Sequence, residues 1–293
     1  MKLHNLLNKI APVEGRFGIE IECESEDTPF PTGVKGWITT HDGSLRKQWN
    51  IEYVFSKPKD YLESIESLEY LHKRFNDYET DNQPSVRTGV HIHVNCTDLS
   101  SRQVLNFITT YLSMERVLSK YCGETREGNL FCLRACDCPG MIQTIENIFR
   151  GGNWYGLGSD NMRYAGVNIT SLIKHGSLEF RTLQTPKDVR EIKAWLDIIN
   201  AIYTYAISIP VGVQIPYDIS FHSPEMWVRK VLGPHLYDLV YYEGMDKDVI
   251  KDMRNIQQLY HVKPVEFAAK VIGGNPMKFD FEAVYETDEE EDF

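Results

Sequence analysis

The sequence lacks the long hydrophobic runs that mark secreted or membrane-spanning chains. Residues 1–7 have no extended apolar core of the kind found in signal peptides. No later apolar run approaches the roughly 20 residues needed to cross a bilayer. We therefore expect a cytoplasmic protein with no membrane partner, in which the six cysteines are reduced thiols.

The cysteines also lack the paired CxxC spacing of a typical zinc site. Four of them cluster, at Cys122, Cys132, Cys136 and Cys138. Structural zinc sites usually draw their ligands from closely spaced pairs of cysteines or histidines. We therefore expect partly buried thiols here, with a zinc site as the less favoured alternative.

The chain has no GxxxxGK[ST] sequence, which excludes a P-loop NTPase. The pair Gly151-Gly152 is too short to indicate a phosphate-binding loop. Internal repeats are absent, and the only low-complexity run is the acidic C-terminal end. The net charge of −11 argues against general nucleic-acid binding, which depends on Lys and Arg that neutralise phosphates.

Apolar residues are plentiful: 42% of the 293 residues are hydrophobic and 12% are aromatic. This composition provides a core for one large domain or two small ones. We predict a main domain over residues 1–210 and a C-terminal helical cover over 211–279 that packs on the same domain. Residues 280–293 are predicted to be an acidic, disordered tail.

Strict alternation of apolar and polar residues predicts β-strands with one dry face. In residues 16–24, three glutamates alternate with Ile19, Ile21 and Cys23, and residues 90–96 repeat this design. Further strands are predicted at 37–40, 50–55, 164–171 and 176–183. Apolar residues at helical spacing predict helices at 60–78, 100–121, 141–150 and 187–207. The fold class is therefore α+β, with a mainly antiparallel sheet and helices packed on one face.

The polar faces of these strands share an unusual composition of acids, imidazoles, amides and one arginine. They carry Glu20, Glu22, Glu52, His91, His93, Asn95, Asn168, Glu179 and Arg181. The outward face of a half-solvated sheet usually carries Thr, Lys, Gln and Ser instead. Carboxylates bind Mg²⁺ and arginine binds phosphate, so the pattern predicts a concave site for Mg²⁺–nucleotide chemistry.

Four charged residues near this cluster are less clearly assigned. We expect Glu24 to lie beyond the cluster in solvent, and Asp42 to act through its turn alone. Arg87 and Arg126 are expected either to bind substrate or to form surface ion pairs.

Five ordered segments resemble motifs of the amidoligases, which are carboxylate–amine ligases of the glutamine synthetase/glutamate–cysteine ligase superfamily. The segments are 17–22, Trp37 with 41–45 and 52–58, 88–95, 163–168 and 176–181. They are similar to FGxExE, W…DGSL…E-V-S-P, GxHVHV, RY…N and GTxEFR in turn. The resemblance spans residues 16–208, and its one minor departure is Lys57 before the proline.

The resemblance implies the curved antiparallel sheet of the glutamine synthetase/glutamate–cysteine ligase type, with residues 1–210 as the catalytic domain. It further implies formation of a peptide or isopeptide amide bond through an acyl phosphate, with ATP and Mg²⁺ or Mn²⁺. The carboxylate and amine substrates could be small molecules, peptides or proteins. A homo-oligomer is also compatible with the family, and residues 151–158 could cover the site.

The resemblance also implies roles for individual residues. The implied metal ligands are Glu20, Glu22, Glu52, His93 and Glu179. The implied nucleotide- or phosphate-binding residues are His91, His93, Asn95, Asn168 and Arg181. The implied catalytic residues are Arg181, Arg163 and Glu179.

Two other function classes fit the same residues. One is a metal-dependent hydrolase that uses His91, His93 and the acids, prefers Zn²⁺ and needs no nucleotide. The other is a catalytically silent binding or inhibitory protein of the same fold. Binding of ATP with Mg²⁺ would separate both from the ligase.

Overall fold

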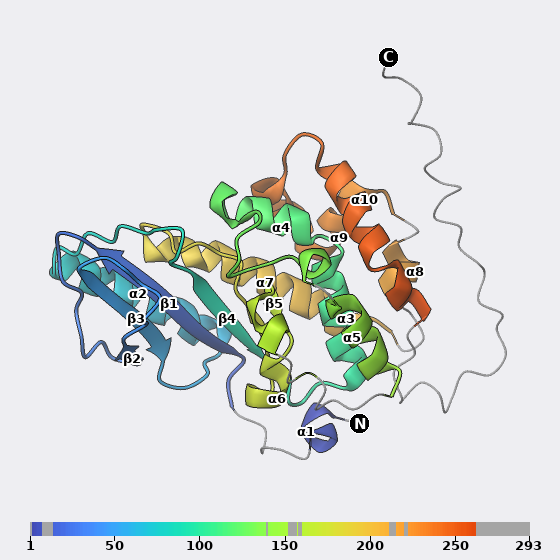
Figure 1. The fold of residues 1–293 in the computed structure, drawn as a ribbon, viewed down its shortest axis with the longest axis horizontal. Coiled ribbons are helices and arrows are strands. Elements are labelled where there is room, and N and C mark those ends of the chain that lie inside the picture. The colour runs from blue at the N-terminus through green and yellow to red at the C-terminus, as the bar shows by residue number, and fades with distance from the viewer. Residues whose placement is uncertain are drawn as a thin grey trace.

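A six-stranded antiparallel sheet forms one half of the molecule (Figure 1). The computed structural model describes residues 2–7, 14–138, 140–151, 157, 160–210, 215–219 and 222–261. The strand order is β2-β3-β1-β4-β6-β5. The strands are β1 (Phe17–Ser25), β2 (Trp37–Thr40), β3 (Trp49–Phe55), β4 (Val90–Asn95), β5 (Val167–Asn168) and β6 (Ser177–Phe180). The predicted mixture of helices with a mainly antiparallel sheet is confirmed.

The register of the sheet brings polar residues from distant parts of the chain side by side. The facing pairs are Glu20–His91, Glu22–Glu52, His93–Glu179 and Asn168–Glu179. Because side chains alternate between the two faces of a strand, all of these residues project from the same side of the sheet. The polar face is therefore continuous across β3, β1, β4, β6 and β5.

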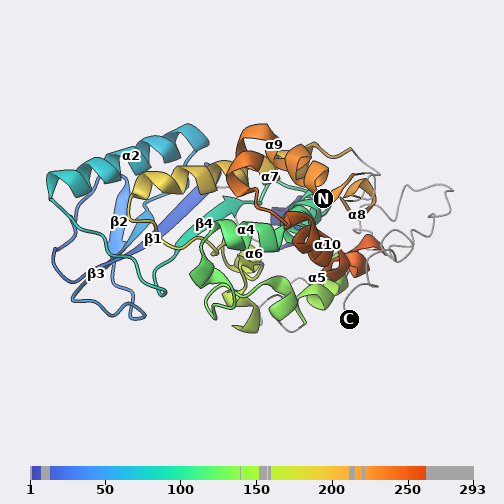
Figure 2. The same ribbon diagram turned by 90° about the horizontal axis from the view of Figure 1, so that it is seen from above.

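The opposite face of the sheet is dry and carries helices (Figure 2). Ile19, Ile21, Ile92 and Phe180 are fully buried there, and burial of each such side chain contributes about 1.5–3 kcal/mol. Helices α2 (Tyr61–Asp77), α3 (Ser101–Leu112) and α7 (Ile192–Ser208) form the covering layer. The Phe107 ring of α3 lies 5.2 Å from the Phe180 ring of β6, measured between centroids.

The long helix predicted over residues 100–121 is wrong, because the structure has two helices there, α3 and α4 (Glu115–Tyr121). The start at Ser100 is confirmed, since its side chain caps the helix by accepting a hydrogen bond from the Gln103 N–H. The break lies at Ser113 and Met114. The Ser113 hydroxyl donates to the Thr110 carbonyl at 2.7 Å, a local bond that competes with helix continuation.

The predicted strand over residues 164–171 is reduced to the two residues of β5. A 3₁₀ helix, η4 (Asp160–Tyr164), precedes it, and α6 (Ser171–His175) follows it. The strand ends because Asn168 Oδ1 accepts hydrogen bonds from both the backbone N–H and the hydroxyl of Thr170. Gly176 then ends α6 at a φ of 72°, where an added Cβ would lie 2.5 Å from Thr97 Cγ2.

The remaining elements are short helices and the C-terminal helical region. They are α1 (Leu3–Leu6), η1 (Glu124–Arg126), η2 (Ala135–Asp137), α5 (Met141–Phe149), η5 (Val189–Glu191), α8 (Ile215–Ile219), α9 (Pro224–Val240), α10 (Met245–Asn255) and η6 (Gln257–His261). No helix in the described ranges is long and apolar enough to cross a membrane. The predicted tail at 280–293 lies outside the described residues.

The C-terminal helices pack on the rest of the chain through both apolar and charged contacts. Helix α9 contacts α7 and α4, and α10 contacts α4. The Trp227 indole N–H donates to Ser113 Oγ at 2.9 Å, inside the α3–α4 break, and the side chain is fully buried. The Arg116 Nε of α4 lies 3.1 Å from the Asp252 carboxylate of α10. These contacts favour a single folding unit over a separate C-terminal domain.

Replacing Trp227 tests whether these helices fold with the sheet. We expect Trp227→Ala to lower the free energy of unfolding by about 3–5 kcal/mol, because it removes a large buried ring. Trp227→Phe should cost about 1 kcal/mol for the lost hydrogen bond. Urea denaturation followed by circular dichroism and intrinsic fluorescence measures both. Met226→Ala, at a neighbouring exposed position, is the matched control. Two separated transitions in the wild-type protein would contradict a single unit.

Candidate active site

A cavity of about 540 Å³ opens over the polar face of the sheet. Its floor comes from β1, β4 and β6, and its walls come from the loops around residues 42–44 and 87–89, from η1, η4 and α6. Most of the lining residues are charged or polar. Of the predicted site residues, Glu20, Glu22, His91, His93, Arg163, Asn168, Glu179 and Arg181 line this cavity.

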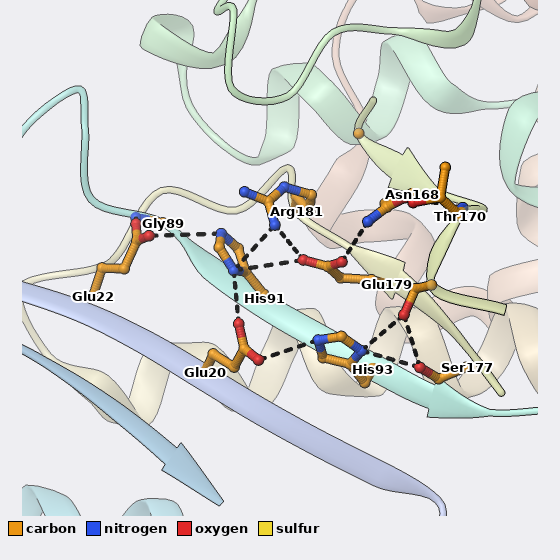
Figure 3. Close-up of polar contacts among 12 residues, drawn as sticks. Glu20, Glu22, Gly89, His91, His93, Asn168, Thr170, Ser177, Glu179 and Arg181 are labelled. Atoms are coloured by element: carbon orange, nitrogen blue, oxygen red, sulfur yellow. Dashed lines mark hydrogen bonds and ion pairs between the residues drawn. The ribbon is translucent and has the colours of Figure 1, made fainter. Parts of the chain in front are cut away.

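Glu20 lies between two imidazoles at the centre of the floor (Figure 3). Its Oε2 lies 3.1 Å from His91 Nδ1, and its Oε1 lies 3.3 Å from His93 Nε2. Burial alone would raise the pKa of Glu20, but the hydrogen bonds with both histidines hold that pKa well below its usual value. Glu20 is therefore an anion at neutral pH.

Glu179 is the second fixed carboxylate of the floor. It forms an ion pair with Arg181, and the Asn168 side-chain amide donates to its Oε2 at 2.6 Å (Figure 3). Burial acts to raise the pKa of Glu179, but the Arg181 guanidinium together with His93 and His91 outweighs burial and keeps that pKa below its ordinary value. Asn168 thus positions a carboxylate instead of facing open space, and it is itself buried.

Glu22, Asp42 and Glu52 form a second acidic group beside the first. The Gly89 N–H donates to Glu22 Oε2 at 2.6 Å. Burial, together with repulsion from Asp42 and Glu52, raises the pKa of Glu22 to about 8. Burial and the neighbouring Glu20 and Asp42 raise the pKa of Glu52 to about 7. This group therefore holds more carboxylates than the protein alone can keep ionised.

The two histidines differ in their protonation. Burial and the Arg181 charge lower the pKa of His91, so its imidazole is neutral at pH 7. Burial also acts to lower the pKa of His93, but the contacts with Glu20 and Glu179 outweigh it and raise that pKa. His93 Nδ1 lies 3.1 Å from Ser177 Oγ, which fixes the orientation of the ring.

Two sets of side chains have the geometry of metal-ion sites. One set is Glu20, His93 and Glu179, and the other is Glu22, Asp42 and Glu52. Within each set one ligand atom per residue lies within 4.8 Å of the others. The first set offers two carboxylates and one imidazole, and the second offers three carboxylates. Both compositions suit hard divalent cations that prefer oxygen ligands.

Asn95 and Arg163 lie away from this centre. Asn95 lines a neighbouring cavity of about 430 Å³, and its side chain contacts the Gly15 carbonyl and Thr97. Arg163 is exposed at the rim, with its guanidinium over the Tyr164 ring. The loop predicted to cover the site, 151–158, falls almost entirely outside the described residues.

Glu24 lies beyond the cluster as expected, but the expectation that it is solvated is wrong. Its side chain is buried, with an exposed fraction of 1%. Glu24 Oε1 accepts the backbone N–H groups of Arg46 and Lys47, and Oε2 accepts the Ser85 hydroxyl at 2.7 Å. Buried charge is stable where donors surround it. Glu24 thus anchors the loop that carries Asp42 to the strand that carries Glu22.

Several residues that line the cavity were not among the predicted site residues. Asp42 was assigned to a turn, which is real because its side chain accepts the Ser44 N–H at 2.6 Å, but it also joins the second acidic group. Lys174 and His175 of α6 line both cavities. The sequence feature that could have pointed to them is a pair of basic residues between two strands that carry predicted site residues. Arg126, left open between two roles, is buried in the wall.

The cysteines do not form a metal cluster among the described residues. Cys122, Cys132 and Cys138 are buried free thiols, and Cys136 is an exposed one. Neither of the two candidate metal groups in the described part of the chain includes a cysteine. This outcome favours the predicted thiols over the zinc alternative.

Glu24 gives a test of how the site loop is held. We expect Glu24→Ala to lower the free energy of unfolding by about 3 kcal/mol, because three donors lose a charged acceptor. Glu24→Gln keeps one acceptor oxygen and should cost about 1 kcal/mol. Equilibrium urea unfolding measures both changes. The exposed Glu26, two residues further along, provides Glu26→Ala as a control. Equal, small losses for Glu24→Ala and Glu26→Ala would refute the anchoring role.

Comparison with known proteins identifies the family of this chain. The model of a family described as "putative amidoligase enzyme" matches residues 51–203, just over half of the chain. That match contains most of β3 and all of β4, β5 and β6, and hence Glu52, both histidines, Glu179 and Arg181. A search of curated proteins finds no match. On the strength of the family match, the chain belongs to the amidoligase family.

Proposed function

We propose that the protein is an ATP- and Mg²⁺-dependent carboxylate–amine ligase that forms an amide bond through an acyl-phosphate intermediate. The observation that carries this proposal is the pair of acidic groups on the polar face, which line one cavity through Glu20, His93 and Glu179 and through Glu22 and Asp42, next to Arg181 and the rim cations. A Mg²⁺–nucleotide has both positive and negative parts. Such a ligand matches a cavity whose anions and cations both project inward.

The residues fit Mg²⁺ or Mn²⁺ by their donor chemistry and by their charge. Burial first, and then repulsion from neighbouring carboxylates, raises the pKa values of Glu22 and Glu52, and a bound cation offsets both effects. Glu20, His93 and Glu179 would hold one ion, and Glu22, Asp42 and Glu52 would hold another. When bound, the ions neutralise and orient phosphate oxygens.

In the first step, a carboxylate oxygen of the substrate attacks the terminal phosphorus of ATP. The bond from that phosphorus to the β-phosphate oxygen breaks, ADP leaves, and an acyl phosphate forms. Charge builds up on the phosphoryl oxygens in the transition state. Arg181 on the floor and Arg163 and Lys174 at the rim are placed to balance this charge. Preorganised cations of this kind contribute several kcal/mol to catalysis.

In the second step, the amine nitrogen attacks the acyl carbon, the C–N bond forms, and inorganic phosphate leaves. The amine must lose a proton as it reacts. His175 lines the cavity, and its ring centroid lies 5.8 Å from that of His93. Burial and the neighbouring His93 and Lys174 lower the pKa of His175, so it is a neutral base at pH 7. We assign proton removal to His175.

The donor sets favour this ligase over the zinc hydrolase. Each candidate metal group in the described residues holds at most one histidine. His91 instead lies among Glu20, Glu179 and Arg181, where it orients the carboxylates. Oxygen-rich sets select Mg²⁺ or Mn²⁺, whereas catalytic zinc sites are richer in imidazole or thiolate.

Carboxylate-to-amide variants test the proposal directly. We expect Glu20→Gln, Glu179→Gln and Asp42→Asn each to lower ADP release by at least about 100-fold, because each removes an anionic ligand. Mg²⁺–ADP binding by calorimetry, and ADP release with panels of amino acids, peptides and polyamines, are the measurements. Glu66→Gln, on the exposed face of α2, is the control. No binding of Mg²⁺–ADP to the folded wild-type protein would reject the assignment.

Metal binding should also release protons. The pKa values of Glu22 and Glu52 are raised to about 8 and about 7. Without metal at pH 7, Glu22 is therefore largely protonated and Glu52 about half protonated, and an ion must displace those protons. The apparent affinity for Mg²⁺ or Mn²⁺ should therefore rise with pH up to about 8 and then level off. Calorimetry in buffers of different ionisation enthalpy should report about one proton released per ion at pH 7. Glu52→Gln should reduce that number, and metal binding that is independent of pH would contradict the second acidic group.

A further inference from the structure

Arg126 is a buried cation whose charge is not matched by the protein around it. The residue is 3% exposed, and it lines the cavity from η1. Its Nε donates to the Thr182 carbonyl at 2.7 Å, and its Nη2 donates to the Arg181 carbonyl at 2.8 Å. Both acceptors are neutral. Within the described part of the chain, no carboxylate oxygen lies within 4.0 Å of the Arg126 guanidinium, the distance that defines an ion pair.

The third nitrogen of this guanidinium donates no hydrogen bond to the described residues. Arg126 Nη1 is inaccessible to solvent and has no hydrogen-bond partner among the described residues. One other cavity-lining residue in the described ranges, Arg181, has such an atom, but the charge of Arg181 is paired with Glu179. An unpaired charge taken out of water is costly, and it is normally paired or ligand-bound. The arrangement therefore indicates an anion that the protein itself does not supply.

The surroundings of Arg126 leave space and provide no counter-charge. An added Cβ on Gly89 would lie 3.3 Å from Arg126 Nη2 and 3.4 Å from both Glu22 Oε2 and His91 Nε2. The absence of a side chain at Gly89 thus lets three polar groups converge. Cys122 and Cys132 are further neighbours, and the Cys132 thiol lies within hydrogen-bonding reach of the Arg126 side chain. Burial raises the pKa of both thiols, so both are neutral and supply no counter-charge.

We propose that Arg126 is the receptor for an oxyanion of the substrates, a phosphoryl or carboxylate group that binds at the Glu22 end of the cavity. Donation from Nε and Nη2 ties η1 to the residues that follow β6, and this tie holds the positive charge of the guanidinium at the wall of the cavity. The inference rests on the proposed function for the identity of the anion. The unmatched charge itself does not depend on that function.

Arg126→Met tests the proposal, because it keeps the length of the side chain and removes its charge. The probes are orthophosphate with Mg²⁺, and acetate, each titrated into the wild-type protein and the variant by calorimetry and by thermal shift. We expect Arg126→Met to weaken the binding of at least one probe by about tenfold or more. If only phosphate binding is lost, the oxyanion is a phosphoryl group, and if only acetate binding is lost, it is a carboxylate. Arg190→Met, at an exposed position, should change neither.

Two more variants keep the test decisive if Arg126→Met unfolds. Arg126→Lys keeps the positive charge but loses the planar guanidinium. This variant should bind the probe more weakly than the wild-type protein but more tightly than Arg126→Met does. Gly89→Ala keeps Arg126 but fills the space beside it, and it should also weaken binding of the probe. Circular dichroism and the melting temperature without probe separate binding from stability.

Unchanged probe affinity in all folded variants, or no binding of either probe to the wild-type protein, overturns the proposal. Wild-type protein that binds phosphate through Arg126 but releases no ADP refutes the proposed function alone.

Discussion

The site depends on one constraint, the antiparallel register of β1 against β4. It places Glu20 opposite His91 and leaves the neighbouring His93 within reach of the same carboxylate. A slip of one residue would move every one of these side chains to the dry face. The fully buried Ile19, Ile21 and Ile92 prevent that slip, because it would expose them to water. The core therefore specifies the geometry of the polar face.

The same register explains how much of the site could be predicted from sequence. Residues on regular strands alternate with period two, so the faces of Glu20, His91 and Glu179 follow from the pattern alone. Their contact across strands follows once the strands are adjacent. The sequence did not reveal which strand pairs with which, and the order β1-β4-β6 was supplied by the structure. The family resemblance pointed to the same residues by a different route.

Prediction failed where side-chain hydrogen bonds override the local pattern. Asn168 ends β5 by bonding to Thr170, and Ser113 breaks a helix whose apolar spacing continues without interruption. Glu24 continues the alternation of Glu20 and Glu22, but it is buried because a distant loop supplies its donors. Asp42 and Arg126 lie outside the strands, on a loop and on a 3₁₀ turn. Periodicity carries no information about where such segments fold back.

The cavity is lined by both carboxylates and cations, and the way they pair bears on the ligand. Its carboxylates come from β1, β6 and the loop at Asp42, and its cations come from the loop at Arg87, from η1, η4 and α6, and from Arg181 after β6. Arg181 is the point at which the two sets meet, since it pairs with Glu179 and lies 3.4 Å from His91. If the sets merely neutralised each other, they would pair directly. Arg126 instead stays unmatched while Glu22 and Glu52 have raised pKa values. A ligand that carries cations on one side and anions on the other satisfies both sets at once, which neither a free metal ion nor a free anion does.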